Sequence, residues 1–139
     1  MVTEQRRAVP TVSDPSDAIV LVVDDQEDLR EAMCRMLERQ GFRVLSARDA
    51  AEAEALCARH DEAIDVLLTD ISLPASSGGD LARALTGVRP GLRVVYVSGL
   101  PKETAIERGL VRAEDHFVQK PFTSESLVRA VRQAARLQR

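Results

Sequence analysis

The sequence predicts an α/β fold in which a doubly wound parallel sheet is covered by helices on both faces. Five short apolar segments alternate along the chain with segments of helical periodicity, and several of the apolar segments are continuous Val, Ile and Leu. Continuous apolar strands are typical of parallel sheets that are buried on both faces. With 139 residues and 45% hydrophobic content, the chain has room for one such domain and not for two.

The five short apolar segments are the predicted strands. They span residues 19–23, 43–46, 66–69, 94–97 and 116–118. Residues 1–17 mix charged residues with prolines and serines and show no apolar period. We therefore expect residues 1–17 to form a flexible leader or the remnant of a linker, and residues 18–139 to form the folded domain.

The first two helices are predicted from periodicity and from capping residues. Gly41 stands where the C-terminal cap of the first helix belongs. The apolar stripe of that helix is Leu29, Ala32, Met33, Met36 and Leu37. Asp49 is suited to cap a second helix, which ends near His60.

The remaining three helices differ in the strength of their pattern. Leu81, Leu85 and Val88 mark the third helix. The fourth, at 102–108, is short and carries Ile106 as its large apolar residue, so we expect it to be poorly ordered. The fifth begins after a cap at Thr123 or Ser124, and its expected buried stripe is Leu127, Ala130, Val131 and Ala134.

Five polar side chains stand at or directly after the ends of predicted strands. They are Asp24, Asp25, Asp70, Ser98 and Lys120. Because the carboxyl ends of parallel strands meet at one edge of a sheet, we expect these side chains to converge there. Taken singly, an aspartate at a strand end is often a helix cap, a serine before glycine a turn residue, and a lysine before proline solvated. The joint occurrence of all five at one edge is what favours a functional site.

Three carboxylates at one edge need a positive partner. At a separation of a few ångströms each pair repels by roughly 4 kcal/mol at an effective dielectric constant of about 20. The group must therefore take up protons or bind a cation, and oxygen ligands without His or Cys favour Mg²⁺ before Ca²⁺. With Lys120 as a second cation, the set has the components of phosphoryl transfer, in which a carboxylate attacks while cations balance the phosphoryl oxygens.

The same residues resemble the receiver domain of two-component response regulators. The resemblance is carried by Val22-Val23-Asp24-Asp25, by Asp70 with Pro74 and Gly78, by Ser98-Gly99, and by Phe117-Val118-Gln119-Lys120-Pro121-Phe122, and it covers residues 18–139. It implies a CheY-like, flavodoxin-like (βα)5 sheet with strand order 2-1-3-4-5. It further implies that Asp70 accepts a phosphoryl group from a sensor histidine kinase or a His-phosphotransfer protein in a Mg²⁺-dependent reaction.

The resemblance also implies a role for each matched residue. Asp24, Asp25, Asp70 and the backbone carbonyl of Ser72 would hold Mg²⁺, and Ser98 and Lys120 would bind the phosphoryl group. Ser98 and Phe117 would form the switch, in which the aromatic ring turns inward after the hydroxyl moves; plain core packing is the alternative for Phe117. The Lys120–Pro121 bond is a candidate cis peptide.

Two other functions fit parts of this pattern. A Mg²⁺-dependent phosphatase or phosphotransferase acting on small molecules also uses an aspartate nucleophile, but such enzymes usually carry a second aspartate two residues later, where this chain has Ser72, and a cap domain. A nucleotide-binding flavodoxin-like protein needs a glycine-rich loop after the first strand, where this chain has Asp24-Asp25-Gln26-Glu27-Asp28. We therefore expect a signalling module with self-phosphorylation and self-dephosphorylation chemistry only, rather than an enzyme.

Charge and hydropathy limit the partners. The chain has 19 Lys and Arg against 22 Asp and Glu, a net charge of -3, which provides no general attraction for DNA or for an anionic membrane. We therefore expect no direct DNA binding. No apolar run reaches the roughly 18 residues of a membrane span, so we expect a cytoplasmic protein. The chain could be a free-standing regulator or the C-terminal receiver of a hybrid sensor kinase. Ser98-Gly99-Leu100 and Lys120-Pro121-Phe122, together with the linker-like leader, resemble the hybrid type and slightly favour the second. Its downstream target is unknown.

An arginine stripe is predicted on the last helix, at Arg129, Arg132, Arg136 and Arg139. Such a stripe is usually a solvated face, and it sometimes contacts an acidic partner.

Overall fold

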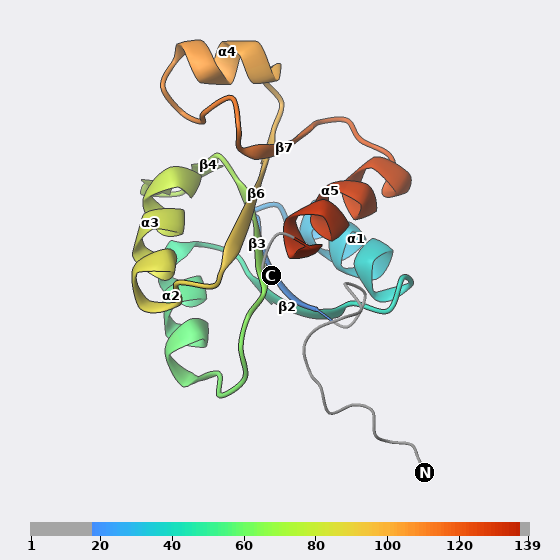
Figure 1. The fold of residues 1–139 in the computed structure, drawn as a ribbon, viewed down its shortest axis with the longest axis vertical. Coiled ribbons are helices and arrows are strands. Elements are labelled where there is room, and N and C mark those ends of the chain that lie inside the picture. The colour runs from blue at the N-terminus through green and yellow to red at the C-terminus, as the bar shows by residue number, and fades with distance from the viewer. Residues whose placement is uncertain (1–17, 137–139) are drawn as a thin grey trace.

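A five-stranded parallel sheet forms the centre of the computed structural model, which describes residues 18–136 (Figure 1). Its strands are β1 (Ile19–Val23), β2 (Arg43–Ala47), β3 (Val66–Asp70), β6 (Arg93–Ser98) and β7 (His116–Gln119). They are ordered β2-β1-β3-β6-β7, and every neighbouring pair is parallel. In chain order of the five strands this is 2-1-3-4-5, so the predicted fold class and strand order are confirmed.

Helices cover both faces of this sheet. They are α1 (Glu27–Glu38), α2 (Ala50–Arg59), α3 (Gly78–Val88), α4 (Lys102–Glu107) and α5 (Ser124–Arg136). Figure 1 shows α1 and α5 on one face and α2 and α3 on the other. Each face has its own apolar cluster, with Met33 and Leu127 among the buried residues of the first and Cys57 and Leu85 among those of the second. Both faces of the sheet are therefore covered by apolar packing, as its continuous apolar strands predict.

The predicted caps at helix ends are confirmed. Gly41 has a φ of 94°, a conformation that favours glycine, and it follows the last turn of α1. Asp49 Oδ1 accepts a hydrogen bond from Glu52 N at 2.8 Å at the start of α2. At the start of α5, Thr123 Oγ1 accepts from Ser126 N at 3.0 Å, so Thr123 rather than Ser124 is the cap.

Three details differ from the sequence predictions or lie outside the described residues. A short antiparallel hairpin, β4 (Ser72–Leu73) with β5 (Ser76–Ser77), follows Asp70; two-residue strands leave no apolar period to detect. Val88 is 72% exposed, because it is the last residue of α3 and borders an open groove between α2 and α3. The expected leader at 1–17 lies outside the described residues.

The fourth helix is present, although it is short. It comprises six residues, buries Ala105 against the α2–α3 side of the core, and leaves Ile106 37% exposed. In Figure 1 it lies beyond the carboxyl ends of the strands, near the start of β7. Within residues 18–136, none of the helices has the length and hydrophobicity needed to cross a membrane.

Leu85 and Val88 on the same helix provide a direct test of this packing. Because Leu85 is 2% exposed and Val88 is 72% exposed, Leu85→Ala should lower the free energy of unfolding by about 2–5 kcal/mol. Val88→Ala should change it by less than about 0.5 kcal/mol. Urea unfolding monitored by circular dichroism measures both, and equal effects of the two substitutions would contradict the placement of α3.

Candidate functional site

Asp24, Asp70 and Lys120 meet at the carboxyl edge of the sheet. Asp24 directly follows β1, Asp70 ends β3 and Lys120 directly follows β7. Lys120 Nζ donates a hydrogen bond to Asp70 Oδ2 at 2.7 Å and lies 3.7 Å from Asp24 Oδ2. One ammonium group is thus shared by two carboxylates that come from neighbouring strands.

Asp24 is the buried member of this group. Its side chain is 0% exposed, and its Oδ2 atom has no hydrogen-bond partner within the described structure, the Lys120 ammonium being beyond hydrogen-bond distance. Burial raises the pKa of Asp24, and the neighbouring charges of Asp70 and Asp25 raise it further; the hydrogen bond from Gln26 N and the charge of Lys120 lower it without reversing the rise. A buried carboxylate oxygen without a donor is a poorly compensated charge, and it suits a hard cation.

The position of Lys120 is fixed from the main chain as well as from its ammonium group. Lys120 N donates to Ser98 O at 2.8 Å, which ties the end of β7 to the end of β6. Burial lowers the pKa of Lys120, but the hydrogen bond and the charge of Asp70, together with Asp24, outweigh burial and raise it. Lys120 is therefore held as a cation. The peptide bond between Lys120 and Pro121 is cis, as the sequence suggested.

The remaining predicted ligands are arranged less tightly. Asp25 is exposed, although it lies close enough to Asp24 to affect its pKa. Ser72 N donates to Asp70 Oδ1 at 2.9 Å, so the segment carrying the Ser72 carbonyl is bound to the Asp70 carboxylate. Among residues 18–136, the structure does not assemble three acidic, histidine or cysteine side chains into a complete metal cage. Asp24 and Asp70 share the Lys120 ammonium group, and the exposed Asp25 directly follows Asp24.

Ser98 and Phe117 belong to β6 and β7, the strands on the side of the sheet that carries Lys120. Ser98 is buried at the end of β6, and its Oγ accepts a hydrogen bond from Leu100 N at 3.0 Å. Phe117 in β7 is half-buried against the apolar cluster on the α2–α3 side and is paired in register with Tyr96 of β6. Ser98 thus lies at the carboxyl edge of the sheet, whereas Phe117 lies within β7 and packs against the core.

Two further residues support the site, and the sequence predictions assigned neither a role. Arg30 Nη1 donates to the backbone carbonyl of Asp24 at 2.9 Å, which brings a second cation beside the acidic pair. Gly78 N donates to Ile71 O at 2.6 Å, and a Cβ atom at Gly78 would overlap the carbonyl oxygen of Asp70. The position of Arg30 on the helix that follows the acidic pair is a signal that could have identified it. The close approach of Gly78 depends on tertiary structure.

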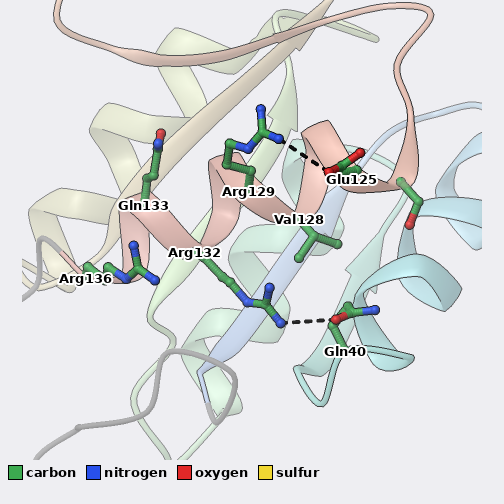
Figure 2. A pocket seen from close by; sticks show the side chains of 8 residues that line it. Gln40, Glu125, Val128, Arg129, Arg132, Gln133 and Arg136 are labelled. Atoms are coloured by element: carbon green, nitrogen blue, oxygen red, sulfur yellow. Dashed lines mark hydrogen bonds and ion pairs between the residues drawn. The ribbon is translucent and has the colours of Figure 1, made fainter.

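A separate groove runs along α5 (Figure 2). It is lined by Gln40 and by α5 residues including Arg129, Arg132 and Arg136. Arg129 pairs with Glu125 at 3.6 Å, and Arg132 donates to Gln40 Oε1 at 3.1 Å with its guanidinium over the ring of Phe42. The predicted arginine stripe is thus partly satisfied within the domain. Arg139 lies outside the described residues.

Comparisons with known proteins agree with this architecture. The family model described as the response regulator receiver domain matches residues 20–132. The probable transcriptional regulatory protein TcrX of Mycobacterium tuberculosis is 34% identical over 122 residues, which cover 86% of this chain and 50% of that protein. The chain thus spans about half the length, or less, of such curated relatives.

A sensor kinase and a solved receiver structure are also similar. Sensor kinase CckA of Brucella abortus is 26% identical over 133 residues, which cover 95% of this chain and 14% of the kinase. The crystal structure of a response regulator receiver domain protein from Clostridium thermocellum superposes with a TM-score of 0.76 at 26% identity, covering 87% of this chain and 96% of that chain.

The buried charge of Asp24 predicts a gain in stability on its removal. Because the folded-state pKa of Asp24 is raised, its contribution to stability is present below the unfolded pKa and is lost as the pH rises through the folded pKa. At pH 7 without added metal, Asp24→Asn should therefore raise Tm by about 4 °C, or about 1 kcal/mol. The difference from wild type should shrink towards pH 4. Thermal melts at both pH values measure this, and a lower Tm for the variant at pH 7 would contradict it.

Gly78 and Gly87, both on α3, form a second matched pair. Because a side chain at Gly78 would overlap the Asp70 carbonyl, and Gly87 has no atom within 4 Å of such a position, Gly78→Ala should cost about 1–3 kcal/mol. Gly87→Ala should be neutral or should stabilise by about 0.5 kcal/mol. Urea midpoints compare them, and a Gly78→Ala protein as stable as wild type would show that the contact is not tight.

Proposed function

The chain belongs to the response regulator receiver family, and from this premise we propose that it is a phosphoacceptor signalling module whose acceptor is Asp70. The donor is a sensor histidine kinase or a His-phosphotransfer protein, and the resulting conformational change controls a partner protein. The observation that carries the proposal is the shared ammonium group of Lys120, 2.7 Å from Asp70 and 3.7 Å from the buried Asp24. Such a cation balances the negative charge that a phosphoryl group brings to a carboxylate.

The proposed reaction is a direct transfer. A carboxylate oxygen of Asp70 attacks phosphorus, a P–O bond forms, and the P–N bond of the phosphohistidine breaks with its electron pair going to the imidazole nitrogen. Lys120 keeps its proton and pairs with the phosphoryl oxygens, in line with its raised pKa. Ser72 N holds the Asp70 carboxylate in orientation through the hydrogen bond at 2.9 Å.

Receiver domains as a family bind Mg²⁺, and the residues of this chain fit that ion. The ion would be held by Asp24, Asp25, Asp70 and the backbone carbonyl of Ser72. The observation that supports this fit is the buried Asp24 Oδ2 atom, which accepts no hydrogen bond within the described residues. When bound, Mg²⁺ supplies positive charge that offsets the carboxylates and the incoming phosphoryl oxygens. Arg30 supports the same site by holding the Asp24 main chain.

The proposed switch starts at Ser98. To donate to a phosphoryl oxygen, its hydroxyl turns towards Asp70 and gives up the hydrogen bond from Leu100 N. The space on the β6–β7 side is then open to the ring of Phe117, which is half-buried beside Tyr96. Movement of these two residues would change the surface around α4 and β7 that a partner contacts.

Partners and cellular context are part of the proposal. We propose a cytoplasmic module that does not itself bind DNA, because its net charge is -3. The named relatives include both a transcriptional regulatory protein and a sensor kinase, so the family similarity is compatible with either a response regulator or a hybrid kinase. The competing function, a small-molecule phosphatase, differs in requiring repeated turnover.

Phosphorylation of Asp70 is directly testable. With acetyl phosphate and Mg²⁺, the wild-type protein should gain the mass of one phosphoryl group, because the donor needs only the Asp70 carboxylate and its cations. Asp70→Asn should gain none, and wild type in EDTA should gain little. Asp61→Asn, an exposed aspartate after α2, is the matched control and should behave like wild type.

Intact mass spectrometry and phosphate release give the measurement. Equal phosphorylation of Asp70→Asn and wild type would refute Asp70 as the acceptor. Sustained hydrolysis of small phosphate esters by wild type, with many turnovers per molecule, would favour the phosphatase instead.

A further inference from the structure

Lys102, the first residue of α4, directs its ammonium group at the main chain that precedes β7. Lys102 Nζ donates to Ala113 O at 2.8 Å and to Asp115 O at 2.7 Å. Its side chain is half-buried rather than extended into solvent. Hydrogen bonds from a charged donor are stronger than neutral ones. Lys102 therefore holds two carbonyl groups of one turn at the same time.

That turn is closed by its own hydrogen bonds and leads directly into β7. Arg112 N donates to Asp115 Oδ2 at 2.8 Å, and Asp115 N donates to Arg112 O at 3.1 Å, which closes residues 112–115. β7 begins at the next residue, His116, and Phe117 follows. Burial lowers the pKa of His116, and the charge of the nearby Lys102 ammonium group lowers it further.

At its other end, Lys102 is close in sequence to Ser98. Ser98 Oγ accepts from Leu100 N at 3.0 Å, and Pro101 then leads directly into α4. The helix itself is lightly anchored, because it buries Ala105 while Ile106 remains 37% exposed. A displacement of Leu100 would therefore move Lys102 more easily than it would deform the core.

We propose that Lys102 is a positioning residue that couples phosphorylation of Asp70 to the movement of β7. The inference rests on the proposed function. When the Ser98 hydroxyl turns towards the phosphoryl group, Leu100 N is released, Leu100 and Pro101 shift, and Lys102 moves with them. The carbonyls of Ala113 and Asp115 follow the ammonium group, so the start of β7 and the ring of Phe117 are displaced together. Lys102 touches no reacting atom.

Hydrogen exchange measured by mass spectrometry tests this coupling. Exchange in the peptide containing residues 113–119 is compared with and without acetyl phosphate and Mg²⁺, and the extent of phosphorylation is measured on the same samples by intact mass. The variants are Lys102→Met, which keeps the length of the side chain without donors, and Lys102→Arg, which keeps charge and donors. Arg108→Met, which removes an exposed cation just after α4, is the matched control.

A coupling role and a merely structural role give different results. We expect wild type, Arg108→Met and Lys102→Arg to change exchange at 113–119 on phosphorylation, and Lys102→Met to be phosphorylated equally but to lose that change. If Lys102 only stabilised the turn, Lys102→Met would raise exchange in both states and keep the difference between them.

Each other outcome overturns the inference. If wild type is phosphorylated and hydrogen exchange at 113–119 does not change, Lys102 does not couple the two events. The same conclusion holds if Lys102→Met still shows the change in exchange, or if Lys102→Met is no longer phosphorylated. In each of these cases phosphorylation of the wild-type protein still supports the proposed function. Loss of the change in exchange in Lys102→Arg, as in Lys102→Met, would also overturn the inference. If wild type takes up no phosphoryl group, the proposed function fails and the coupling with it. Should Lys102→Met fail to fold, Lys102→Gln replaces it under the same criteria.

Discussion

The contact between Lys120 and the two carboxylates of Asp24 and Asp70 is the interaction on which the rest of this structure depends. Asp24 is fully buried, and a buried carboxylate is strongly unfavourable unless a cation compensates for it. Lys120 supplies part of that compensation and keeps its own proton because of it. The edge of the sheet is therefore a place where added positive charge is favourable and where a negative group is accepted only together with cations.

The parallel sheet explains why these residues meet although they lie far apart in the sequence. β1 and β3 are neighbours, with Val23 opposite Thr69. Asp24, which follows Val23, and Asp70, which follows Thr69 and ends β3, therefore lie side by side. β6 lies beside β3, and β7 beside β6, with Ser98 opposite Gln119. Lys120 therefore follows β7 at the correct height to reach across the end of β6. The strand order of the sheet therefore brings Asp24, Asp70 and Lys120 to the same edge.

The sequence could predict features that depend on local pattern or on this winding. The caps at Asp49 and Thr123 follow from short-range hydrogen bonds, and the shared edge follows from the alternation of strands and helices. The exposure of Val88 could not be predicted, because periodicity does not show where a helix extends past its core. The bonds of Lys102 to the carbonyl groups of Ala113 and Asp115 are tertiary contacts of a long side chain, for which spacing carries no signal.

The close approach of Gly78 to Asp70 has a consequence for engineering this domain. The main chain after Asp70 is held from two sides, since Ile71 N donates to Val97 O at 3.0 Å and Gly78 N donates to Ile71 O at 2.6 Å. That wall of the site is rigid and tolerates little redesign. The opposite wall, around Leu100, is better suited to redesign, because the backbone there is attached through the Ser98 hydroxyl and not directly to Asp70.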